Sequence, residues 1–160
     1  MARFGVTGHM NLTAESMPLV YQALRVALAP YAGDELIGIS CIARGADSIF
    51  AQVVLDLGGE LEVLLPTSNY RETKVKPDHA AQFDELMRQA ATVRVLPFRK
   101  ANRDAYQAAN EALVSSSDRL FAVWDCRTGT GKGSTASVVE YARSQGVPVE
   151  IIWPAGAKRE

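Results

Sequence analysis

The sequence is poor in the residues that metal-binding and disulfide-bonded proteins need. Its 160 residues include two cysteines, Cys41 and Cys126, and two histidines, His9 and His79. None of the four has the spacing of a zinc site, and the cysteines form no disulfide framework. We therefore predict reduced thiols, no metal site and a cytoplasmic location. A Mg²⁺ ion that bridges ligand phosphates would leave little trace in a sequence, so this question stays open.

Long hydrophobic runs and an excess of charge are also absent. No apolar run approaches the ~20 residues of a membrane helix. The N-terminal MARFGVTGHMNL reaches Gly and His too early for a signal peptide. The 17 basic and 18 acidic residues give a net charge of -1, whereas general nucleic-acid binders usually carry a basic surplus. The sequence predicts neither a membrane nor a nucleic-acid partner.

Short apolar runs alternate along the chain with segments of helical periodicity. The runs RFGVTG, ELIGISCI, ELEVLLP, TVRVLPF, DRLFAVW and VPVEIIW are typical of strands. Helical stripes separate them, and this alternation favours right-handed βαβ crossovers. The predicted fold class is α/β, a doubly wound, mainly parallel sheet of about six or seven strands with helices on both faces. We expect one Rossmann-like domain over residues 1–154 and a frayed tail over residues 155–160.

The composition of the runs also indicates where each strand lies. LIGI and LFAVW are unbroken, as in strands buried on both faces, whereas LEVLL, VRVL and VPVEI contain a charge or a proline and are expected nearer an edge. The first helix is predicted to open near Thr13, which is a good N-cap residue.

Three strand-to-helix junctions combine glycine with hydroxyl, amide or charged groups. They are VTGHMN, ARGAD and the stretch WDCRTGTGKGSTAS. In parallel sheets ligands bind outside the carboxyl ends of the strands, and helix N-termini attract phosphate. The predicted ligand-binding residues are Thr7, Gly8, His9, Arg44, Gly45, Asp47, Asp125, Gly129, Gly131, Lys132, Gly133, Ser134 and Thr135.

The third junction, rich in glycine, is the strongest of these signals, although it matches neither common glycine signature. Gly133 follows Lys132 where a P-loop has Ser or Thr, and no third glycine completes the dinucleotide fingerprint. Thr135 can cap the helix that follows, and Asp125 can accept from ribose hydroxyls. Arg44 can contact an anion or be only a surface charge, and His9 can contact a ligand or bond a backbone carbonyl. The basic cluster Arg99, Lys100 and Arg103 can join the site or lie outside it.

The junctions together resemble a known group of proteins. GISCIARGAD is similar to a segment of the Smf/DprA DNA-processing proteins, and SDRLFAVWDCRTGTGKGSTASVVEYARSQGVPVEII is similar to the second half of the SLOG superfamily. The resemblance covers nearly the whole chain. It implies a Rossmann-like fold, a nucleotide or nucleotide-derived ligand, and a homodimer or larger homo-oligomer.

LOG enzymes of this superfamily hydrolyse the N-glycosidic bond of nucleoside monophosphates, but their signature is incomplete here. Their catalytic glutamate corresponds to Val138, and their Arg-Lys pair corresponds to Ala109 and Asn110. In a helix that begins near Ser134, Val138 falls on the stripe that faces the sheet, and Glu140 is predicted to point away from the sheet and toward solvent. Asp47 and Asp125 are the remaining catalytic candidates.

The sequence therefore favours a nucleotide-binding sensor or carrier, and it leaves enzymatic activity undecided. One alternative is a phosphoribohydrolase with a rearranged carboxylate, and another is a carrier of the molybdenum cofactor. Binding of single-stranded DNA, as in Smf/DprA, would need a cationic track that the balanced charge does not favour.

Overall fold

The computed structural model describes residues 2–127 and 134–160. In these ranges the strands are β1 (Ala2–Gly8), β2 (Leu36–Ser40), β3 (Glu60–Thr67), β4 (Thr92–Phe98), β5 (Arg119–Val123) and β6 (Val149–Ile152). The helices are α1 (Ser16–Leu28), α2 (Ala46–Asp56), α3 (Tyr70–Lys74), α4 (Pro77–Gln89), α5 (Arg103–Ser115) and α6 (Thr135–Ser144), with a 3-10 turn at Ala29–Tyr31. None of the described helices is long and apolar enough to cross a membrane.

The six strands form one parallel sheet in the order β4-β3-β2-β1-β5-β6. The chain builds outward from β1 to β4 and then returns to the other side of β1, where β5 and β6 pair. The strand order thus reverses between β1 and β5, which is where parallel α/β sheets bind ligands. The predicted fold class is confirmed, with six strands.

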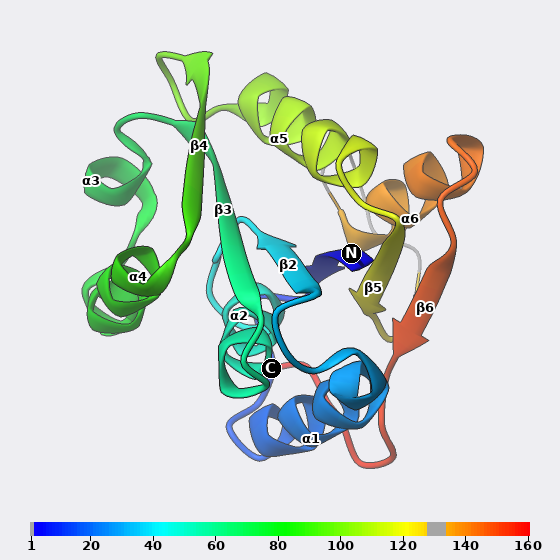
Figure 1. Cartoon of the computed structure of the whole chain (residues 1–160). Helices are drawn as coiled ribbons and strands as arrows, with labels where there is room; N and C mark the ends of the chain where they lie inside the picture. The colour runs from blue at the N-terminus through cyan, green and yellow to red at the C-terminus, as the bar shows by residue number, and fades with distance from the viewer. Residues whose placement is uncertain (1, 128–133) are drawn as a thin grey trace.

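Helices cover both faces of the sheet (Figure 1). On one face α1 and α2 pack over alternate residues of β1 and β5, including Phe4, Val6 and Phe121. On the other face α5 and α6 cover Leu64 and Leu120, among others. Because each buried side chain of this size contributes about 1.5–3 kcal/mol, the two apolar layers fix the sheet against its helices.

Burial follows the predicted order of the strands except at β3, which the sequence predicts nearer an edge but which lies between β4 and β2 and is buried over residues 61–67. Strands β2 and β5 are interior, and β4 and β6 form the edges. Val93 and Val95 of β4 are accordingly 41% and 46% exposed. The charge that marks β3 also has a partner, because Glu62 is 2.7 Å from the Arg3 guanidinium and 3.7 Å from that of Arg94.

Both ends of the chain depart from the expectations. Helix α1 begins at Ser16, and the Thr13 carbonyl accepts from the Ser16 N–H at 3.0 Å. The expected frayed tail is instead bonded to the loop after β1. Lys158 N–H donates to Ser16 Oγ at 2.7 Å, Glu160 N–H donates to the Asn11 carbonyl at 2.7 Å, and Arg159 bridges Leu12 as an antiparallel partner. Main-chain bonds of this kind carry no signal in sequence periodicity.

Candidate functional site

The loops after β1, β2 and β5 meet at the carboxyl edge of the sheet. The His9 N–H donates to the Val123 carbonyl at 3.2 Å, and the His9 carbonyl accepts from the Ala46 N–H at 3.1 Å. Gly45 has φ +85°, and a Cβ there would lie 2.6 Å from the His9 carbonyl oxygen. Glycine at position 45 thus allows the first two loops to touch. The structure therefore brings the first two predicted junctions and the start of the third together.

A cavity of about 580 Å³ opens at this edge, and we call it the main cavity. This volume lies in the usual range for small-molecule sites. It is lined by Val6, Thr7, Gly8, Met10, Cys41, Ala43, Asp47, Pro66, Tyr70, Lys74, Arg103, Tyr106, Ala109, Asn110 and Thr135. The lining includes the ends of β1 and β3, the loop after β2, and the first residues of α5 and α6.

Four of the predicted site residues, Thr7, Gly8, Asp47 and Thr135, lie in this lining. Packing also requires glycine at position 8, because a Cβ there would lie 2.5 Å from Ala46 Cβ. Its absence lets α2 approach the end of β1, which brings Asp47 to the cavity.

Two exposed cations stand at the rim of the main cavity. Lys74 ends α3 and Arg103 begins α5. Neither forms an ion pair with any residue of the two described ranges, although eight other pairs occur there. Arg103 belongs to the predicted basic cluster, whereas Arg99 and Lys100 are not part of this lining. The rim thus offers two positive charges to an anion.

The inner part of the cavity is acidic. Burial raises the pKa of the Asp47 carboxyl to about 7, although a hydrogen bond from the Ala43 backbone opposes the rise. Burial, reinforced by the nearby Asp47 charge, also raises the pKa of the Cys41 thiol, and Tyr70 has a raised pKa mainly for the same reason. A carboxyl that titrates near neutral pH inside a cavity is typical of functional sites.

A second space of about 340 Å³, the switch-point cleft, adjoins the main cavity at Gly8 and Thr135. Its lining is Gly8, His9, Met10, Asn11, Trp124, Arg127, Ser134, Thr135, Ala136 and Arg159. Ser134 caps α6, because its hydroxyl accepts from the Ser137 N–H at 3.2 Å. The cap is thus Ser134 and not Thr135, which leaves the Thr135 hydroxyl at the boundary of both spaces.

Asp125 lies in a different environment from Asp47. Its side chain is 11% exposed, 3.3 Å from His9 Nε2 and 3.6 Å from the Arg159 guanidinium. Burial opposes ionisation, but the Arg127 N–H and the charges of His9 and Arg159 outweigh it and lower the pKa of Asp125. The carboxylate therefore holds the C-terminal segment against the loop after β5, and it is not among the residues that line the main cavity.

Replacing Asp125 by Asn is expected to lower the free energy of unfolding by about 1–2 kcal/mol at pH 7, because Arg159 loses a partly buried partner. Urea titrations of Asp125→Asn, Arg159→Ala and the double variant measure the coupling, expected at about 0.5–1 kcal/mol. Strictly additive losses would show that the pair does not hold the tail.

Arg44 and the middle of the third junction complete the predicted set. The Arg44 guanidinium lies 3.1 Å from Glu160 Oε1, so the C-terminal residue satisfies this charge. Both residues line a third space of about 280 Å³ beside Tyr70 and Lys74. Gly129, Gly131, Lys132 and Gly133 lie outside the described residues.

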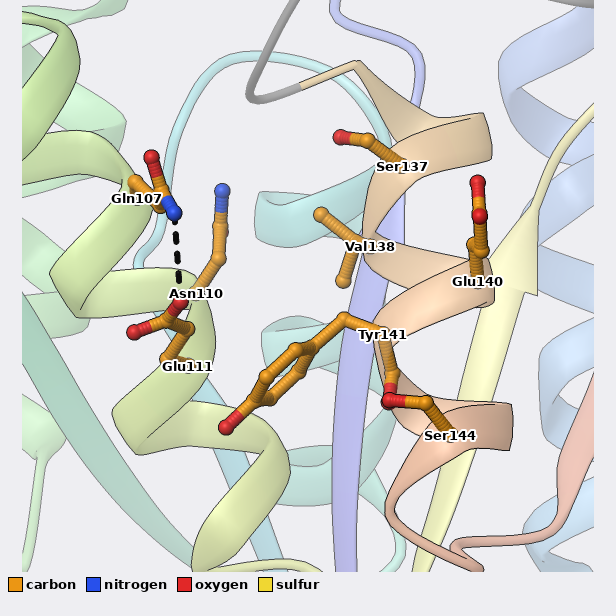
Figure 2. Close-up of a pocket in the computed structure, with 8 residues that line it drawn as sticks. All are labelled: Gln107, Asn110, Glu111, Ser137, Val138, Glu140, Tyr141 and Ser144. Atoms are coloured by element: carbon orange, nitrogen blue, oxygen red, sulfur yellow. Dashed lines mark hydrogen bonds between the residues drawn. The ribbon is translucent and has the colours of Figure 1, made fainter.

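A groove of about 320 Å³ separates α5 from α6 (Figure 2). Gln107, Asn110 and Glu111 enter it from α5, and Tyr141 points toward α5 from α6. Its lining contains two glutamates and no basic residue, so it does not suit a phosphate. Asn110 also lines the main cavity and thus connects the two spaces.

Two residues of α6 decide whether the LOG signature is present: Val138, which corresponds to the catalytic glutamate, and Glu140, two residues later. Val138 is 4% exposed and packs in the core, as predicted from its helical stripe. Glu140 is exposed, on a different side of α6 from Tyr141 (Figure 2). Neither supplies a carboxylate to the main cavity. Within the described residues, no group of three His, Cys, Asp or Glu side chains could hold a metal ion.

Lys74, Tyr70 and Tyr106 are lining residues that the sequence patterns did not identify. The carboxyl-edge rule could have found Tyr70, because β3 ends at Thr67 on the same edge. The loop after β3 contains no glycine, so it does not share the feature that marks the three predicted junctions.

No family model and no curated protein matches the sequence. Solved structures do match the fold. DNA processing protein A (DprA) from Streptococcus pneumoniae has a TM-score of 0.70 at 17% identity, over 98% of this chain and 52% of that one. DprA from Helicobacter pylori, described with a single-stranded DNA binding mode, has a TM-score of 0.70 at 16% identity, over 99% and 68%. The molybdenum cofactor carrier protein from Chlamydomonas reinhardtii has a TM-score of 0.58 at 16% identity, over 94% and 75%.

The chain therefore shares its fold with these proteins, which confirms the Rossmann-like fold that the sequence resemblance implied. It spans about half the length of the Streptococcus protein. At these identities the likeness concerns the fold, and the functions of these proteins are not carried over by it.

Proposed function

We propose that the protein binds a nucleotide or nucleotide-derived phosphate ligand in the main cavity, as a sensor or carrier. The observation that carries this proposal is the pair of cations Lys74 and Arg103, which have no ion-pair partner among residues 2–127 and 134–160 and stand at the rim of a cavity lined by the ends of β1 and β3 and the loop after β2. The first turn of α6 begins at Thr135 on the same lining, and a helix N-terminus adds a partial positive charge. An anionic group at the rim would contact Lys74, Arg103 and the first turn of α6.

The lining also suits the rest of such a ligand. Thr7, Thr135 and Asn110 supply hydroxyl and amide groups for a sugar, and Tyr70 and Tyr106 supply aromatic surface. The cleft beside it holds Arg127, which extends the positive charge along the start of α6, and Arg159, which is paired with Asp125. A ligand with one anionic end and one flat end fits this distribution better than a long polyanion does.

Binding is tested by calorimetry with nucleoside monophosphates, ribose 5-phosphate and inorganic phosphate. Arg103→Ala and Lys74→Ala are each expected to weaken nucleotide binding about 10-fold, because each removes a charge-assisted contact worth about 1.4 kcal/mol. Arg143→Ala, at the far end of α6, removes the same charge away from the cavity and serves as the control. Equal affinities of all three variants and the parent protein would place the ligand elsewhere.

One observation favours a second candidate function, hydrolysis of the N-glycosidic bond of a nucleoside 5'-monophosphate. A carboxyl with a pKa of about 7 inside the cavity is suited to general acid chemistry. Asp47, rather than Asp125, would be the rearranged carboxylate. Release of free base from a nucleoside monophosphate, abolished in Asp47→Asn, would support the hydrolase over the carrier.

Carriage of the molybdenum cofactor would use the same cavity. Mass spectrometry of the small molecules that co-purify with the protein distinguishes this alternative from the other two.

A further inference from the structure

The inner end of the main cavity contains a carboxyl group that lacks a cationic partner. Asp47 lies in the first turn of α2 and lines the cavity. Over residues 2–127 and 134–160 it forms no ion pair, and a backbone hydrogen bond from Ala43 is its one favourable contribution to ionisation. A desolvated carboxyl is costly unless donors satisfy it. This arrangement calls for a ligand that brings donors.

An aromatic wall stands beside this carboxyl. The rings of Tyr70 and Tyr106 meet edge to face, with centroids 6.3 Å apart and planes at 83°. Phe83 packs against Tyr70 at 6.1 Å and holds it in place. Tyr106 remains half-buried on the cavity lining. Tyrosine faces of this kind are suited to contact with a flat ring.

The charges in the cavity are ordered from its rim to its interior. Lys74 and Arg103 are exposed at the rim, whereas Asp47 is half-buried and burial raises its pKa. The Ala43 N–H donates to the carboxyl, and the Cys41 thiol and the Tyr70 hydroxyl lie close enough for its charge to raise their pKa values. An ionised carboxylate offers two acceptor oxygens and no donor, so acceptor sites remain for a ligand. The ligand that fits has an anionic group at one end and adjacent N–H donors at the other.

We propose that the inner end of the main cavity is a recognition subsite for a heteroaromatic ring whose edge carries two adjacent N–H donors. The Asp47 carboxylate would accept both, and the ring would lie against Tyr106. The 2-aminopyrimidin-4-one edge of guanine or of a pterin has this pattern. Adenine presents a donor beside an acceptor, and hypoxanthine presents a single donor there. This inference rests on the proposed function and names the class of ring that the ligand carries.

Calorimetry with GMP, IMP and AMP tests the subsite, because GMP and IMP differ only in the 2-amino group. We expect GMP to bind at least about 10-fold more tightly than IMP, since a hydrogen bond to a charged acceptor is a strong one. In Asp47→Asn the ratio should fall to within about 2-fold. Asp84→Asn, an exposed carboxylate paired with Arg71, is the matched control and should keep the ratio. Circular dichroism checks that both variants are folded.

Proton release provides a second readout. Titrations at pH 6 in buffers of different ionisation enthalpy should show GMP binding accompanied by release of nearly one proton, because the carboxyl must ionise to accept two donors. Tighter binding of AMP without proton release would overturn the inference, since it would require Asp47 to stay protonated. Equal affinities for GMP, IMP and AMP, unchanged in Asp47→Asn, would also overturn it and leave the proposed phosphate ligand standing.

Guanosine, which lacks the phosphate, separates the two proposals. Binding of guanosine as tight as that of GMP, lost in Asp47→Asn and unchanged in Arg103→Ala, would support the ring subsite and contradict the phosphate site. Absence of binding by GMP and guanosine alike would overturn the ring subsite, and absence of binding by AMP, IMP and ribose 5-phosphate as well would overturn the phosphate site.

Discussion

Replacing Asp47 by Asn is expected to raise the free energy of unfolding at pH 8 by up to ~4 kcal/mol while changing it little near pH 4. Burial raises the pKa of this carboxyl in the folded protein from its ordinary 3.8 to about 7. A pKa that is higher by one in the folded chain than in the unfolded chain corresponds to about 1.4 kcal/mol. An amide of the same shape has no ionisation to oppose, and its oxygen can still accept from the Ala43 N–H.

The sign of this pH dependence follows from the protons bound. Between pH 3.8 and about 7 the Asp47 carboxyl is protonated in the folded chain and ionised in the unfolded chain. The folded state therefore binds more protons, and the contribution of Asp47 to stability falls as the pH rises through this window. Below pH 3.8 both states are protonated and the contribution is complete.

Urea titrations at pH 4, 6 and 8 measure the effect as the difference between Asp47→Asn and the parent protein. Asp84→Asn is again the control. Its Arg71 partner lowers the pKa of Asp84, so the amide should destabilise slightly at pH 8 and not stabilise. A constant difference between Asp47→Asn and the parent protein over the three pH values would show that Asp47 does not titrate near pH 7. A stabilised variant that has lost GMP discrimination would indicate that the carboxyl is retained for recognition.

The sequence predicted the fold because its signals are local. Each strand is a short apolar run and each helix has a 3.6-residue stripe, so the alternation alone indicates a parallel sheet. The carboxyl-edge rule then placed Thr7, Asp47 and Thr135 at the same edge, and all three line one cavity. Helical periodicity also placed Val138 in the core and Glu140 outside it.

The different roles of the two candidate aspartates could not be predicted in this way. Asp125 is held by His9 and Arg159, which are 116 residues before it and 34 after it. Asp47 acquires its raised pKa from burial, in a cavity that residues of β3, α3 and α5 also line. Both environments are created by contacts between distant segments, and no local pattern marks them.

The two cations at the rim, Lys74 and Arg103, also could not be predicted from local sequence patterns. One ends a helix of five residues and the other begins α5, and neither lies in a glycine-containing junction. The cavity joins them only because α3 and α5 follow the carboxyl ends of neighbouring strands, β3 and β4. Strand order is therefore the missing information, and it decides which loops become neighbours.

Gly45→Ala is the second substitution with a large expected effect, a loss of about 4 kcal/mol in the free energy of unfolding. Gly45 has φ +85°, where an L side chain is strained, and its new Cβ would lie 2.6 Å from the His9 carbonyl oxygen and 2.9 Å from Met10 Cα. These are backbone atoms that cannot swing away. The loop after β1 must therefore move, and the hydrogen bond between Ala46 N–H and the His9 carbonyl is lost.

Gly146→Ala separates the two causes, because Gly146 has φ +75° and no atom within 4 Å of the added Cβ. This control should lose only about 1 kcal/mol, the cost of the backbone conformation. Urea titrations compare the two variants, and calorimetry with GMP should show weaker binding in Gly45→Ala alone, since Asp47 follows the displaced start of α2. Equal losses of stability in both variants would mean that the loops after β1 and β2 are not in the contact that positions the cavity.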